Sequence, residues 1–161
     1  MTEQKRRPKP VFKNFDEVIT DIEQLASGKI VTSGNYTFAQ IVKHLATTNQ
    51  MVIGEIVPPK LPLMMRMLMP LMRKKILNGP VEPGFKLPNT AMQTFFWDTS
   101  DVQLSDAIDK FKRSVEAYRK NGPLPVHPIF GKATAEEIEG ITLRHAAMHL
   151  SFVSAEPEVR N

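Results

Sequence analysis

The stretch from Leu104 to Tyr118 carries the most regular apolar pattern in the chain, and the pattern has a helical period. Its apolar residues alternate spacings of four and three: Leu104, Ile108, Phe111, Val115 and Tyr118. Residues with this spacing form one apolar stripe along a helix, as in helices that pack in bundles. The turn Asn121-Gly122-Pro123 then provides a helix stop. We therefore expect a helix over residues 104–121.

Three further segments have the same period, and each starts with a pair of residues typical of a capping box. The pairs are Asn14 with Glu17, Thr37 with Gln40, and Thr134 with Glu137. They predict helices over 15–26, from 38 to about 57 and from 135 to about 155. No segment shows convincing strand alternation. We expect an all-α four-helix bundle with a long irregular excursion between the second and third long helices.

The excursion has two parts of different composition. The first, Lys60 to Leu77, is rich in methionine and basic residues, and Pro70 predicts a kinked or broken helix. Because methionine side chains are flexible and apolar, we expect this segment to cover a site or to form a subunit contact. Copper(I) binding by the methionine sulfurs is a weaker alternative. The second part, Asn78 to Ser100, is a long loop of the kind that is often functional. Its only tryptophan, Trp97, is expected to pack against the end of the bundle.

Charge and composition narrow the functional classes. The chain has 161 residues, no cysteine and a net charge of +4. Residues 1–10 contribute +3 and residues 60–75 contribute +5, so the remainder is acidic and nucleic-acid binding is not expected. We expect a disordered basic arm (1–13), one domain (14–155) and a polar tail (156–161). No secretory signal is seen, and the apolar run 61–72 is too short for a membrane span, so we expect a cytoplasmic protein without a membrane partner.

Two histidines lie four residues apart on the apolar stripe of the last predicted helix. Side chains at this spacing are neighbours, so the rings of His145 and His149 can converge on one point, as metal ligands do. His44, at the edge of the stripe of the second predicted helix, completes a set of three nitrogens if the two helices face each other. The alternative is a pair of hydrogen-bonded core histidines without metal.

These residues also carry a family resemblance. The segments FAQIVKHLATT, HPIFGKAT and HAAMHLSF resemble the DinB-like superfamily of four-helix bundles, and within it a domain-of-unknown-function family; the resemblance spans about residues 14–153. It implies a divalent metal held by His44, His145 and His149, and for a set of three imidazole nitrogens we expect zinc, nickel or a similar ion. It also implies a transferase or isomerase that uses a low-molecular-weight thiol and a small-molecule substrate.

Other residues are weaker candidates for supporting roles. His127 precedes a proline in a turn, so we expect second-shell hydrogen bonding or turn structure; Asp98, Gln93 and Trp97 are candidate second-shell or substrate contacts. No acidic general base is evident near the histidines, which favours thiol transfer over hydrolysis. The competing hypothesis is a non-catalytic, metal-free bundle that acts as an interaction or homodimerisation module through its methionine-rich surface. A weaker third is binding of nucleic acid or an acidic partner through the basic segments.

Overall fold

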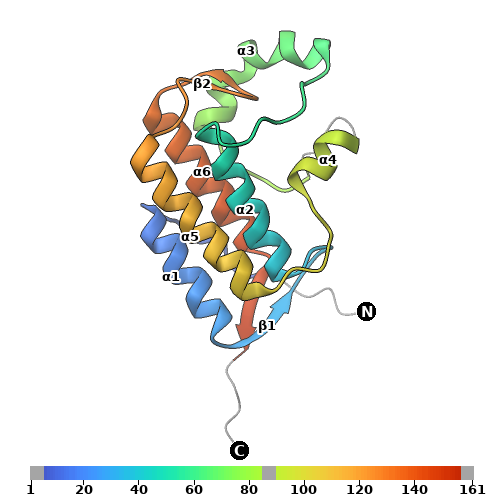
Figure 1. The fold of residues 1–161 in the computed structure, drawn as a ribbon, viewed down its shortest axis with the longest axis vertical. Coiled ribbons are helices and arrows are strands. Elements are labelled where there is room, and N and C mark those ends of the chain that lie inside the picture. Colours follow the sequence, from blue (N-terminus) through green and yellow to red (C-terminus); the bar gives the residue numbers. More distant parts are fainter. Residues whose placement is uncertain (1–5, 85–89, 157–161) are drawn as a thin grey trace, which may run out of the picture.

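Four helices lie side by side and enclose the core (Figure 1). The computed structural model describes residues 6–84 and 90–156. The four helices are α1 (Phe15–Ala26), α2 (Phe38–Val52), α5 (Leu104–Asn121) and α6 (Ala135–Leu150). Their inward faces bury large apolar side chains almost completely, among them Ile22, Leu45, Phe111, Ile138 and Leu150. Burial of these stripes stabilises the helices more than local propensity does.

The predicted capping residues do start the helices. The Asn14 side chain accepts the Glu17 N–H, and Thr37 and Thr134 each form a complete capping box. The predicted ends of α2 and α6 were too late. Helix α2 ends at Val52, well before the two prolines, because Gly54 takes a left-handed φ of +81°. Helix α6 ends at Leu150 because the residues after it turn into a strand.

Short strands correct the expectation of an all-α fold. Strand β1 (Lys29–Thr32) pairs antiparallel with β4 (Val153–Glu156), in a register that places Lys29 opposite Glu156 and Thr32 opposite Val153. Strands β2 (Val126–His127) and β3 (Gly131–Lys132) form a second, smaller pair. Strands of two to four residues are too short to show the alternation by which a half-buried strand is recognised in a sequence.

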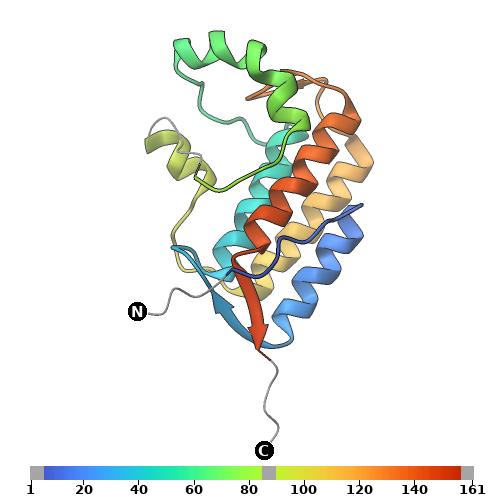
Figure 2. The same cartoon turned by 180° about the vertical axis from the view of Figure 1, so that it is seen from behind.

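The excursion contains two helices. Helix α3 (Leu63–Asn78) includes Pro70 without interruption and bends along its length, as Figures 1 and 2 show. The bend is expected because proline lacks the N–H that would bond to the preceding turn. The predicted loop from 78 to 100 holds a further short helix, α4 (Thr90–Phe96). The Arg144 side chain donates to the carbonyl oxygens of Leu77 and Gly79, and thereby joins the end of α3 to α6.

Part of the predicted basic arm lies against the helices. Arg7 forms an ion pair with Asp21 at 2.5 Å and donates to the carbonyl oxygen of Leu150. The Arg6 guanidinium lies 4.2 Å from the centre of the Phe152 ring. Residues 1–5 of the arm and 157–161 of the tail lie outside the described residues. Across 6–84 and 90–156, none of the helices is both long and apolar enough to cross a bilayer.

Candidate metal centre

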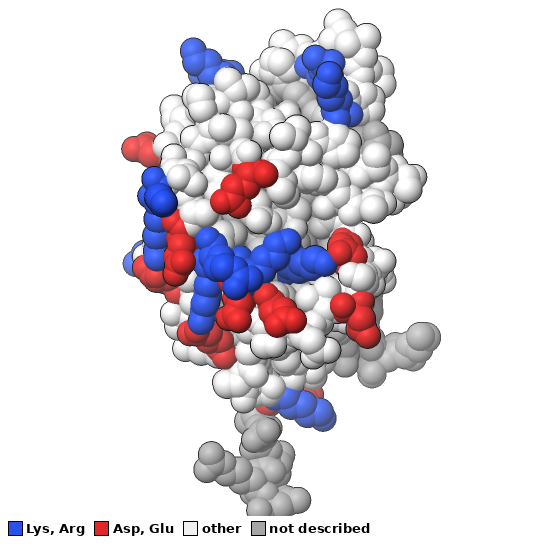
Figure 3. Space-filling view, in the orientation of Figure 1, with Lys and Arg blue, Asp and Glu red and all other residues white. Residues whose placement is uncertain are grey.

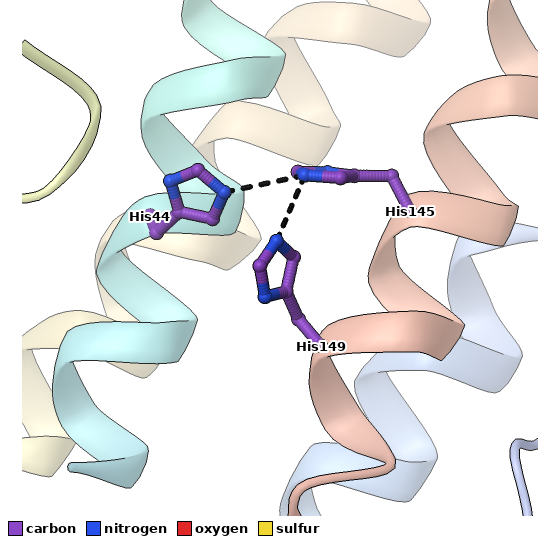
Figure 4. Close-up of side chains that lie close together, drawn as sticks. All are labelled: His44, His145 and His149. Atoms are coloured by element: carbon purple, nitrogen blue, oxygen red, sulfur yellow. Dashed lines mark hydrogen bonds between the residues drawn. The ribbon is translucent and has the colours of Figure 1, made fainter. Parts of the chain in front are cut away.

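The three predicted histidines meet between α2 and α6 (Figure 4). Nε2 of His145 lies 3.2 Å from Nε2 of His44 and 2.9 Å from Nε2 of His149. One ring nitrogen from each histidine lies within 4.8 Å of the others, which is close enough for a single metal ion. His44 is buried, and His145 and His149 are partly exposed as whole residues, although the surrounding protein desolvates their rings.

Helix geometry explains why the rings converge. His145 and His149 are one turn apart on α6, and their ring centres are 4.5 Å apart in an edge-to-face arrangement. His44 comes from α2, which contacts α6, and its ring is 4.6 Å from that of His149. The sequence placed His44 only at the edge of the α2 stripe, but its side chain is 5% exposed. Both helices of the site are therefore fixed by core packing and carry the rings into one volume.

A backbone hydrogen bond determines the protonation of His44. Nδ1 of His44 lies 2.9 Å from the carbonyl oxygen of Phe96. A carbonyl oxygen only accepts hydrogen bonds, so Nδ1 carries the proton. Burial, with a smaller contribution from His145, lowers the pKa of His44 to about 3, so the ring is neutral at pH 7. Nε2 of His44 therefore presents a bare lone pair toward His145.

This protonation leaves the nitrogens without enough hydrogen-bond donors. The single Nε2–H group of His145 can donate a full hydrogen bond to His44 or to His149, but not to both. Burial lowers the pKa of His145 to about 4, so protonating this ring to gain a second N–H donor is disfavoured at pH 7. A metal ion accepts lone pairs from all three rings. Zinc–nitrogen bonds of about 2.0–2.1 Å in a tetrahedral site place the nitrogens about 3.3 Å apart. Two of the three separations, 2.9 and 3.2 Å, are close to this value and the third is within 4.8 Å, so the donor set is compatible with a divalent metal.

An aromatic stack covers one side of the site. The Trp97 ring lies parallel to the His44 ring, with centres 4.0 Å apart, and Tyr36 stacks on Trp97 at 3.7 Å. Trp97 also meets His149 edge-on at 5.2 Å. Trp97 therefore contacts two of the three histidines directly, whereas the sequence led us to expect it only to pack against the end of the helices. Sequence reasoning missed Tyr36 and the Phe96 carbonyl, and a backbone acceptor leaves no sequence signal.

The other predicted site residues, His127, Asp98 and Gln93, do not belong to the cluster of three histidine nitrogens. Nδ1 of His127 accepts the backbone N–H groups of Ile129 and Phe130 at 3.1 and 3.2 Å, so this buried ring organises its own turn. Asp98 forms an ion pair with Lys43, and Gln93 is exposed. Among the described residues, the cluster of side chains able to hold an ion contains histidines only, without Asp or Glu.

Because burial keeps these histidines neutral, the metal-free protein should lose stability in mild acid. Burial lowers the pKa of His44 to about 3, those of His127 and His145 to about 4, and that of His149 well below 6.5. Below about pH 6.5 the unfolded chain binds protons that the folded chain does not. The free energy of unfolding should therefore fall between about pH 6.5 and 5, by up to about 1.4 kcal/mol per pH unit for each histidine.

Urea denaturation in the presence of a chelator measures this slope, and pH values above 5 avoid the titration of most carboxylates. The variant His145→Gln should have a shallower slope than the wild type because it loses one titrating ring. A free energy of unfolding that stays constant from pH 6.5 to 5 contradicts the burial of neutral histidines.

Comparison with known proteins adds a family but no activity. No curated protein and no solved structure matches the chain. One family model matches residues 4–156, which include all three histidines and both helices that carry them. The chain therefore belongs to the family described as Protein of unknown function (DUF1569).

Proposed function

We propose that this protein is a divalent-metal-dependent enzyme of DinB-like type, a four-helix bundle whose metal is held by His44, His145 and His149. The observation that carries the proposal is the meeting of three Nε2 atoms with too few protons to bond one another. Zinc and nickel are among the ions that imidazole ligands suit, and we propose that one of them is bound. Helix packing alone brings the three rings together, with or without an ion. The proposal of a metal rests on the ring nitrogens and their protons instead.

Three protein ligands suit a catalytic site better than a structural one. Structural zinc sites have four protein ligands, whereas catalytic sites have three and keep one position for water or substrate. The bound metal would lower the pKa of a group at that position and so supply a nucleophile at neutral pH. Phe96 would hold His44 in the tautomer that leaves Nε2 free to bind the metal, and Trp97 would keep the His44 ring in its plane.

The surroundings of the histidines favour thiol transfer over hydrolysis. Hydrolases usually need a general base, yet no carboxylate accompanies the three rings in the described part of the chain. Glu137 belongs to the capping box of α6, and Glu55 accepts a hydrogen bond from Gln50. A thiol ionised at the metal is itself the nucleophile and needs no such base. Because the chain has no cysteine, the thiol would be a small molecule.

A second candidate function rests on a different part of the molecule. Helix α3 exposes several large apolar side chains, Leu63 and Leu71 among them. An exposed apolar surface is a common sign of an interaction site. Under this alternative the protein is a non-catalytic interaction module, and its histidines bind no metal. Metal content separates the two candidates.

The metal-binding proposal predicts about one divalent ion per chain. Elemental analysis of untagged protein, purified without chelator, should find this ratio in the wild type and a large loss in His145→Ala. The matched control is His127→Asn, because asparagine retains an acceptor for the turn and the fourth histidine lies outside the site. A wild type that carries no metal and takes none up on titration contradicts the proposal, as does a His145→Ala variant that retains it.

The thiol proposal predicts that a small thiol enters the open position. In protein loaded with cobalt(II), addition of a low-molecular-weight thiol should produce intense sulfur-to-cobalt absorption, because soft thiolate ligands bind such ions. His149→Ala, which lacks one ligand, should bind cobalt weakly and show little of this absorption. If the cobalt-loaded wild type gives the same spectrum with and without thiol, the thiol-dependent reaction is refuted, whereas the metal site itself is not.

A further inference from the structure

Helix α3 carries most of the apolar surface exposed by the described residues. Of their ten exposed large hydrophobic side chains, six lie on this one helix. The six form two rows with a spacing of four residues, one of Leu63, Met67 and Leu71 and the other of Met64, Leu68 and Met72. Residues four apart are neighbours on a helix, so the rows make one continuous stripe, which we call the α3 stripe.

The α3 stripe faces away from the core. The buried side chains of α3, Met69 and Leu77, lie on the other side of the helix. Figures 1 and 2 show α3 at one end of the molecule, together with β2 and the segment between α2 and α3. These two neighbours each add an exposed valine, Val126 and Val57. Exposed apolar side chains therefore occur on three separate segments at this end of the molecule.

The same end of the molecule is positively charged. Between Ile56 and Val81 the chain has five cationic residues and no Asp or Glu; the cations are Lys60, Arg66, Arg73, Lys74 and Lys75. None of the five forms an ion pair within residues 6–84 and 90–156, although the pKa of the Glu137 carboxyl group, lowered mainly by the Thr134 N–H, is lowered further by the nearby Arg73 and Lys74. In Figure 3 this upper end of the visible face shows basic but no acidic side chains. The partner that fits this surface is therefore apolar and anionic.

We propose that α3 docks this protein on an anionic lipid surface. The α3 stripe would enter the boundary between headgroups and acyl chains, and Lys74 and Lys75, which follow the stripe on the same side of α3, would contact lipid phosphates. The run 61–72 is too short to span a membrane, which led us to expect no membrane contact, but a helix in the interface plane need not span it. The inference is independent of the proposed metal site.

The charges and the shape favour lipid over the other occupants. A second copy that docked through the same helix would bring together two ends of the same positive charge, which disfavours association. The groove of a partner protein would take a single row of anchor residues, whereas the α3 stripe exposes two rows, and Val57 and Val126 are exposed on segments at the same end. A bilayer is broad enough to meet all three segments at once.

Vesicle flotation with the intact 161-residue chain tests the proposal. The wild type should float with phosphatidylcholine vesicles that contain phosphatidylserine, and less with phosphatidylcholine alone or at high salt. Met67→Ser/Leu71→Ser and Lys74→Glu/Lys75→Glu should each weaken binding at least about tenfold. The controls Val11→Ser and Lys29→Glu change an exposed apolar and a basic residue outside α3 and should bind like the wild type.

Three results would overturn the proposal. The first is a wild type that stays in solution with anionic vesicles. The second is binding that the α3 variants and the controls retain equally. The third is a wild-type dimer in sedimentation that Met67→Ser/Leu71→Ser converts to a monomer, because a second copy then covers the stripe. Changes at Leu71, 83% exposed, should not impair folding, and an unchanged melting temperature of each variant confirms it.

Discussion

The hydrogen bond from Nδ1 of His44 to the carbonyl oxygen of Phe96 is the constraint on which the site depends. It joins the end of α4 to the middle of α2, and it determines which nitrogen of His44 is free. The next residue, Trp97, stacks on the same ring, so one short segment sets both the proton and the plane of His44. Reversing this tautomer would turn Nε2 into a donor, and it could no longer bind a metal.

Three neutral imidazoles in one small volume are costly without a shared partner. A buried polar group left without a hydrogen bond costs about 1–3 kcal/mol, and His145 cannot satisfy both neighbours. The fold nevertheless holds the rings together, because α2 and α6 are fixed by packing and α6 also by its capping box and by Arg144. Such a preformed set of donors is what a metal site requires.

Much of the helical framework and the three histidines could be predicted because local rules govern them. Capping residues located the helix starts, and the spacing of His145 and His149 already implied neighbouring rings. Features that depend on tertiary contacts could not be predicted. The Phe96 carbonyl belongs to the backbone, and the pairing of β1 with β4 joins segments from opposite parts of the chain. Trp97 stacks on His44, but nothing in the sequence indicates which side chain this tryptophan packs against.

X-ray absorption spectroscopy of the zinc-loaded protein tests the central claim most directly, because it reads the identity and distance of the metal's ligands. The account predicts three imidazole nitrogens at about 2.0–2.1 Å and one oxygen from an exchangeable water. His149→Ala should show one imidazole fewer. A spectrum dominated by oxygen ligands, or one that His149→Ala leaves unchanged, would show that zinc binds elsewhere and would contradict the three-histidine site.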